Sequence, residues 1–157
     1  MAIRYPKGGE DMGSRMTPDQ RIELGQWEEL LGGEDAIILA VGRMVGTALR
    51  VCIELMGAGI SCGVIDARFV KPMDEKLLEK ALRDHKLVIT LEDNVLAGGF
   101  GSGVAEWMID HGCTTPLLRL GVPDRFIEYG MIDEQMNECG LDAQSIRNAI
   151  IKRMTNL

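Results

Sequence analysis

The chain has 157 residues, of which 46% are hydrophobic and 26% charged, a composition typical of a globular domain rather than a disordered segment. Its formal net charge of −7 argues against nucleic acid and anionic membranes as main partners. No apolar run approaches the roughly 20 residues of a membrane span, and the first residues lack a signal-peptide pattern, so we expect a cytoplasmic protein. Four cysteines occur singly without a CxxC pair, which predicts reduced thiols and no zinc site.

The first 24 residues differ from the rest of the chain. They contain Pro, Gly and charged residues without hydrophobic periodicity, which is typical of a linker or arm. Two cations on this arm, Arg4 and Lys7, could bind a phosphate group, although such arms can also be merely solvated. We predict an arm over residues 1–24 and one domain over residues 25–157. Because the sequence opens within a linker, we expect a piece cut from a longer chain.

The first half of the domain alternates strand and helix patterns. A weak alternation over Gly25–Leu31 predicts a short edge strand, and the apolar run Ala36–Val41 predicts a buried strand. Apolar residues recur at helical spacing over Val45–Met56, and Gly57–Gly59 is a suitable helix end. A further strand is expected over Ile60–Ile65.

The second half is organised around the stretch Lys86–Met108. Leu87–Leu91 is a β-branched apolar run, expected to be the central strand, and a glycine loop then leads into a helix. Four other elements are expected here: a helix over Glu75–Arg83 capped by Asp74, a strand over Pro116–Leu120, and helices over Asp133–Cys139 and Asp142–Met154. The alternation predicts a three-layer α/β/α sandwich whose sheet has about five mostly parallel strands and one antiparallel edge strand.

The glycine loop Gly98–Gly103 does not match a nucleotide-binding motif. A dinucleotide fingerprint that starts at Gly99 would need its third glycine at Val104, and no Gly-Lys-Ser/Thr of a P-loop follows. The carboxylates of Glu92 and Asp93 disfavour a bound anion at the following helix. Since adjacent residues of a strand point to opposite faces, only one of the two can face a site. We favour tight strand–helix packing and loop hydrogen bonding, with ligand binding as the alternative.

Other polar residues offer little catalytic chemistry. His85 and His111 have no Ser or Cys partner in a recognisable nucleophile motif, so each is expected at the surface or at a helix end. Asp66, Arg68 and Lys71 follow a strand at its carboxyl end, where contact surfaces of α/β domains lie. These three residues are expected to order a loop or to contact a neighbouring domain.

Five stretches of the chain together form a recognisable set of motifs: Ile3–Gly8, Asp66–Asp74, Glu92 with Gly98–Gly103, Leu120–Ile127 and Gly140–Ala143. With these motifs the chain resembles the carboxyl-terminal domain of the 1-deoxy-D-xylulose-5-phosphate synthases, within the transketolase superfamily. The resemblance spans almost all of this chain but only the last part of the much longer family sequence.

The resemblance implies an activity for the full enzyme. It would condense pyruvate with glyceraldehyde 3-phosphate and release carbon dioxide, at the entry to isoprenoid, thiamine and pyridoxal synthesis. Thiamine diphosphate and Mg²⁺ would be bound by the preceding domains, together with the catalytic residues. In this chain alone we therefore expect no catalytic residue, no metal site and no cofactor. Its expected partners are those preceding domains and, in the full enzyme, a second copy.

The resemblance also implies roles for individual residues. The family motif RYPRG places its phosphate-binding second basic residue at Lys7, where lysine replaces arginine and loses the bidentate fork. Tyr129 stands where a histidine is common in the family, which puts in doubt any role assumed for that position. Contact or loop roles are expected for Asp66, Arg68, Lys71, Glu92, Gly99, Gly101, Asp124 and Arg125.

Two other functions stay open from the sequence. The chain could be a separately encoded, non-catalytic subunit of a split transketolase-like enzyme. It could also be a small-ligand binding or regulatory module that uses the glycine loop.

Overall fold

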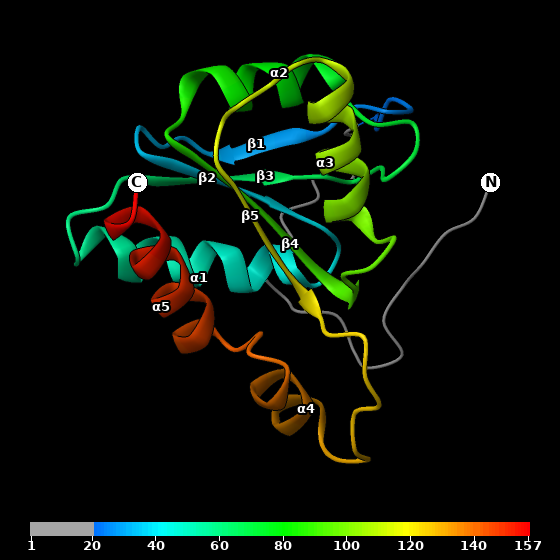
Figure 1. The fold of residues 1–157 in the computed structure, drawn as a ribbon, viewed down its shortest axis with the longest axis vertical. Coiled ribbons are helices and arrows are strands. Elements are labelled where there is room, and N and C mark those ends of the chain that lie inside the picture. Colours follow the sequence, from blue (N-terminus) through cyan, green and yellow to red (C-terminus); the bar gives the residue numbers. More distant parts are fainter. Residues whose placement is uncertain (1–20) are drawn as a thin grey trace.

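The computed structural model describes residues 21–157, which form an α/β domain around one five-stranded sheet (Figure 1). In spatial order the strands are β1 (Glu28–Leu31), β3 (Cys62–Asp66), β2 (Ala36–Ala40), β4 (Leu87–Val95) and β5 (Leu117–Val122). β1 pairs antiparallel with β3, and the other pairs are parallel, which confirms the predicted sheet. The prediction that the Leu87–Leu91 strand is central was wrong, because β2 takes the middle place.

Helices cover both faces of the sheet, which confirms the three-layer sandwich (Figure 1). α1 (Met44–Met56) and α5 (Ala143–Thr155) pack on one face, and α2 (Glu75–Asp84) and α3 (Phe100–Asp110) on the other. All of β2 is buried because apolar side chains meet it from both layers. None of the helices in residues 21–157 is long and apolar enough to cross a membrane.

Several boundaries differ from the predicted ones, and β3 and β4 show local differences. β3 begins at Cys62 rather than Ile60, because the chain is still closing α1: the Ile60 N–H donates to the Leu55 carbonyl at 3.1 Å, and Gly59 has a φ of 76°. β4 continues past Glu92 to Val95, which pairs again with Val122 of β5 after an irregularity in the register.

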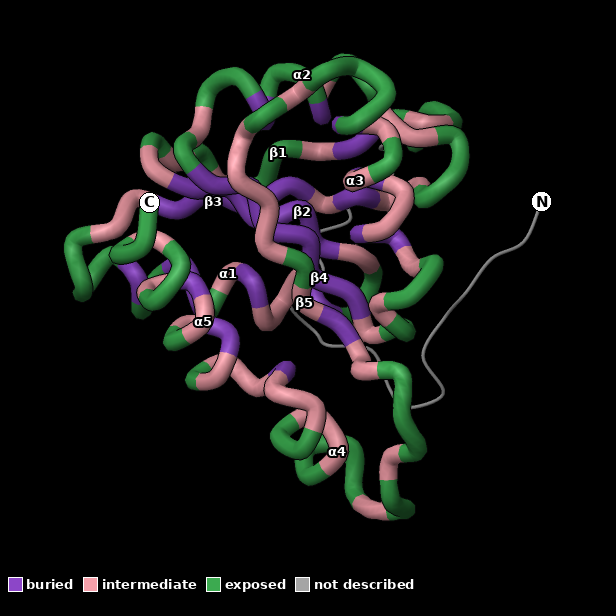
Figure 2. The backbone as a smooth tube through the Cα atoms, viewed as in Figure 1, coloured by how far each residue is buried: buried purple, intermediate pink, exposed green. Residues whose placement is uncertain are grey.

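Residues 123–138 extend away from the body of the domain, as a loop followed by α4 (Ile132–Glu138) (Figures 1 and 2). α4 has no buried residue, in contrast to the other four helices of the described chain. Large apolar side chains in this segment are exposed, among them Phe126, Tyr129 and Met131. We call residues 123–138 the outer segment.

Candidate functional site

Glu92 lies at the carboxyl end of the sheet with its carboxylate inside the protein, since the residue is only 2% exposed. Its Oε2 accepts a hydrogen bond from the backbone N–H of Phe100 at 2.8 Å, and its Oε1 accepts one from the N–H of Gly101 at 2.9 Å. These donors belong to the first turn of α3, where backbone N–H groups lack helical partners and the helix dipole is positive. A carboxylate of the chain itself therefore occupies the place that an external anion would take.

The glycines of the loop allow this close approach. A Cβ at Gly99 would overlap the Glu92 carboxylate, and a Cβ at Gly101 would overlap Thr90 Oγ1. On the neighbouring strand β5, a Cβ at Gly121 would lie 3.0 Å from Cγ of Glu92. These contacts favour the interpretation of the loop as a tight strand–helix junction over its interpretation as a cradle for a ligand.

Ser102 and Arg119, which the sequence reasoning missed, hold the same loop. Ser102 Oγ donates to the carbonyl of Leu96 at 2.7 Å and accepts from the Gly98 N–H at 3.0 Å. Arg119 of β5 donates from Nη1 to Ser102 Oγ at 2.8 Å. A serine in the first turn of a helix, following a run of glycines, is a signal that could have identified the loop contact.

A second polar group lies where β3 ends beside the edge strand β1. Arg68 forms an ion pair with Glu28 of β1, and its Nε is 3.5 Å from Oδ2 of Asp66. Burial raises the pKa of Asp66 to about 6. The Arg68 contact does not offset this effect, because the guanidinium is directed mainly at Glu28. The group joins the loop after β3 to the neighbouring strand.

Trp27, also missed from the sequence, fixes the rest of that loop. Its indole N–H donates to the carbonyl of Phe69 at 2.8 Å, and its backbone N–H donates to Asp74 Oδ2 at 3.0 Å. The other oxygen of Asp74 accepts from the Leu77 N–H at 3.0 Å, which confirms Asp74 as the cap of α2. The Trp27 ring also meets the Phe100 ring edge-on, at 5.7 Å between centroids. Strand β1, the loop after β3 and the start of α3 are thereby joined.

The outer segment is braced by its own residues. Arg125 donates from Nη1 to Glu138 Oε1 at 2.6 Å and from Nη2 to the Glu138 carbonyl at 3.3 Å. Gln135 donates to the Glu128 carbonyl at 2.9 Å. Phe126 and Tyr129 point fully into solvent from this ordered frame. The segment therefore presents aromatic side chains without packing them on its own domain.

The thiol of Cys62 is buried in an environment that disfavours its thiolate form. Hydrogen bonding to the Cys52 thiol and burial both raise the pKa of the Cys62 thiol. All four cysteines are free thiols, so the structure contains no disulfide among residues 21–157.

The structure does not bring the sequence-predicted candidates together in one site. Glu92, Gly99 and Gly101 form the junction of β4 and α3, whereas Asp66 and Arg68 lie at the β1–β3 edge. Lys71 is exposed in the loop after β3. Asp124 and Arg125 belong to the outer segment, and Arg4 and Lys7 lie outside the described residues. Within residues 21–157 no group of three or more His, Cys, Asp or Glu side chains could hold a metal ion.

Comparison with known proteins identifies the family. The profile described as "Transketolase, C-terminal domain" matches residues 25–146. This chain belongs to the transketolase C-terminal domain family. Within that family it matches the C-terminal domain of 1-deoxy-D-xylulose-5-phosphate synthase: it is 49% identical to the synthase of Aquifex aeolicus (strain VF5) over 95% of this chain, and 44% identical to that of Caldanaerobacter subterraneus subsp. tengcongensis over 98% of it. The chain spans about a quarter of the length of these relatives (24% in both).

Solved structures share the fold. A structure named "Split gene transketolase, inactive beta4 tetramer" superposes with a TM-score of 0.82 and 33% identity, covering 89% of this chain and 46% of that one. A transketolase from Pichia stipitis in complex with sedoheptulose 7-phosphate gives a TM-score of 0.62 at 20% identity, covering 83% of this chain and 18% of that one. Both superpositions show that these transketolase structures contain the fold of this chain.

Proposed function

We propose that the chain serves as the C-terminal domain of a synthase that condenses pyruvate with glyceraldehyde 3-phosphate to 1-deoxy-D-xylulose 5-phosphate and carbon dioxide. The observation that carries the proposal is the 49% identity to a 1-deoxy-D-xylulose-5-phosphate synthase over 95% of this chain. In this proposal the domain supplies packing, dimer contacts and a substrate-phosphate contact rather than catalytic groups.

Thiamine diphosphate would supply the carbanion chemistry of the full enzyme, together with Mg²⁺. Residues 21–157 do not fit this pair: they contain no donor cluster for a metal ion, and Glu92 takes two N–H groups at the amino end of α3. A diphosphate there would meet a buried carboxylate. We therefore assign the cofactor to the preceding domains of the enzyme.

This assignment predicts that the isolated chain is inactive. Calorimetric titration of the purified chain with thiamine diphosphate and Mg²⁺ should give no binding heat, and incubation with pyruvate, glyceraldehyde 3-phosphate and cofactor should give no product. The matched control is a full-length relative such as the Aquifex aeolicus synthase under the same conditions. Stoichiometric cofactor binding by the isolated chain would overturn the division of labour between the domains.

The predicted substrate contact is Lys7. An ammonium group binds phosphate as a point charge, whereas arginine offers two parallel hydrogen bonds. In the full-length enzyme, K7R should lower the KM for glyceraldehyde 3-phosphate by roughly 3- to 10-fold, equivalent to about 1 kcal/mol, with little change in kcat. The control is K152R, the same change on an exposed residue in the last turn of α5. Equal KM values for the two variants would show that Lys7 does not hold the phosphate.

The exposed outer segment supports a role in packing against other parts of the enzyme. Phe126 and Tyr129 lose their exposed apolar area only if something outside residues 21–157 covers them. We propose that the preceding domains or the second copy cover these two side chains in the assembled enzyme. Asp124 and Arg125 of the same segment would then lie at that interface.

A second candidate function rests on the split-gene transketolase structure, which is 33% identical to this chain with a TM-score of 0.82. The chain would then be a separately encoded subunit that associates with a catalytic partner. The DNA upstream of the Met1 codon distinguishes the two proposals. A continuous reading frame would support the domain, and a stop codon followed by a ribosome-binding site would support the subunit.

A further inference from the structure

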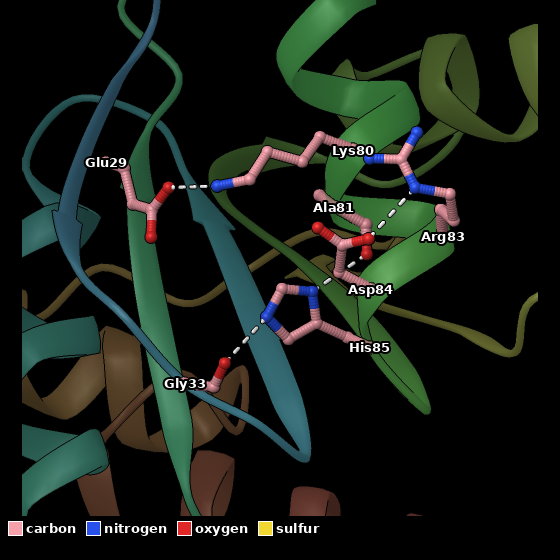
Figure 3. A network of polar contacts seen from close by, with 7 residues as sticks. All are labelled: Glu29, Gly33, Lys80, Ala81, Arg83, Asp84 and His85. Atoms are coloured by element: carbon pink, nitrogen blue, oxygen red, sulfur yellow. Dashed lines mark hydrogen bonds and ion pairs between the residues drawn. The ribbon is translucent and has the colours of Figure 1, made fainter.

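His85 lies between the end of α2 and the turn that joins β1 to β2 (Figure 3). Its Nδ1 is 2.9 Å from the carbonyl oxygen of Ala81, one helical turn earlier in α2. Its Nε2 is 3.1 Å from the carbonyl oxygen of Gly33, 52 residues away in that turn. Both ring nitrogens therefore face acceptors, from two different parts of the chain.

A carbonyl oxygen can only accept a hydrogen bond, and neutral imidazole carries a single N–H. Only the protonated ring, with an N–H on each nitrogen, can donate to both carbonyls. We propose that His85 is a proton-dependent clamp, whose imidazolium form ties the end of α2 to the β1–β2 turn. Loss of one proton removes one of the two bonds and leaves a nitrogen lone pair facing a carbonyl oxygen.

Neither acceptor is free to take another orientation. Ala81 lies in the last turn of α2, where carbonyl groups lack helical partners and the helix dipole is negative, which favours a cation. The backbone of Gly33 is packed closely on the sheet: a Cβ there would overlap the Gly63 nitrogen and lie 2.8 Å from the Ala36 carbonyl oxygen. Because both acceptors are fixed, the number of hydrogen bonds that the ring can make depends on its protonation state.

Six of the charged groups near the clamp form three ion pairs. On α2, Lys80 pairs with Glu29 of β1 at 2.9 Å, and Arg83 pairs with its neighbour Asp84 at 3.0 Å (Figure 3). Lys86, which follows His85 in the sequence, pairs with Asp35 of the turn at 2.7 Å. The turn adds the carboxylate of Glu34. These groups are four acids (Glu29, Glu34, Asp35, Asp84) and three bases (Lys80, Arg83, Lys86).

The expected consequence is a pH-dependent stability. A group that binds a proton more tightly in the folded state stabilises the fold in acid and loses that contribution as the pH rises. Histidine changes charge between about pH 5 and 8, so the clamp should weaken across that range. His111 is the natural control, because its Nδ1 meets a single acceptor, the Trp107 carbonyl at 2.8 Å, which the neutral ring satisfies.

Because the chain has two histidines, each can be observed alone. In H111Q, ¹⁵N spectra of the ring at pH 7 should show the two-N–H pattern of an imidazolium for His85. In H85Q, the spectra of the remaining ring provide the reference for a histidine with one carbonyl acceptor. A neutral pattern for His85 at pH 7 would overturn the proposal, and this measurement needs only that H111Q folds.

A second measurement tests the clamp itself. Wild type and H85Q are compared by urea unfolding from pH 5 to pH 8, both in a D66N background so that Asp66 does not titrate in the same range. The glutamine of H85Q can still donate hydrogen bonds from its amide group, but it does not titrate. At pH 5 its unfolding constant should exceed that of the parent by roughly 3- to 10-fold, and the ratio should shrink towards one by pH 8. A ratio that is independent of pH would overturn the proposal.

Discussion

Replacing Glu92 with alanine is expected to lower the free energy of unfolding by about 3–4 kcal/mol, from the loss of two buried hydrogen bonds to a charged acceptor and from the cavity left behind. The residue is 2% exposed and accepts from the Phe100 and Gly101 N–H groups. With alanine, these two donors keep their place at the positive end of α3 but lose their acceptor. Chemical denaturation followed by circular dichroism measures the difference.

The more informative variant is E92Q, which keeps the volume of the side chain. One amide oxygen replaces two carboxylate oxygens, and the new NH₂ group points at a backbone N–H, so we expect a loss of about 2 kcal/mol. The control is E106Q on the exposed side of α3, which should change the stability by no more than about 0.5 kcal/mol. If E92Q unfolds at the same urea concentration as E106Q, the carboxylate does not stabilise the start of α3.

The local structure of the junction between β4 and α3 was predictable from the sequence. The apolar run at Leu87–Leu91, the glycines and the following helical pattern predicted a strand, a tight turn and a helix, and each is present. Local periodicity supports such predictions because it depends on neighbouring residues alone. Strand order depends on distant pairings, and β2 rather than β4 became the middle strand because β3 and β4 pair on either side of it.

The residues that complete the candidate site were missed for the same reason. Trp27 is hydrogen-bonded to Phe69 and Asp74, which are 42 and 47 residues away in the sequence. Arg119 of β5 donates a hydrogen bond to Ser102 of α3. No local pattern marks such contacts. Glu92 was recognised as a polar residue at a strand end, but its bonds to the first N–H groups of α3 depend on how closely the helix approaches, which the packing decides.

The second large effect is expected from Asp66, as a dependence of stability on pH. Burial raises its pKa from 3.8 to about 6, so the folded protein holds this proton more tightly than the unfolded chain. The sign follows from linkage: the contribution is complete below about pH 4, where both states are protonated, and is lost as the pH rises through about 6. The difference between the two values corresponds to about 2–3 kcal/mol.

D66N should abolish this loss, because an asparagine stays neutral at every pH. The difference in unfolding free energy between D66N and wild type is therefore expected to shift by about 2–3 kcal/mol in favour of D66N as the pH rises from 4 to 8. Urea unfolding at each pH measures this difference. D35N provides the contrast, since the hydrogen bond to Lys86 lowers the pKa of Asp35, so its titration lies below the pH range in which Asp66 titrates. The effect of D35N should be constant from pH 5 to pH 8. A constant difference for D66N as well would mean that Asp66 is ionised in the folded domain. Arg68 would then pair with Asp66 rather than mainly with Glu28.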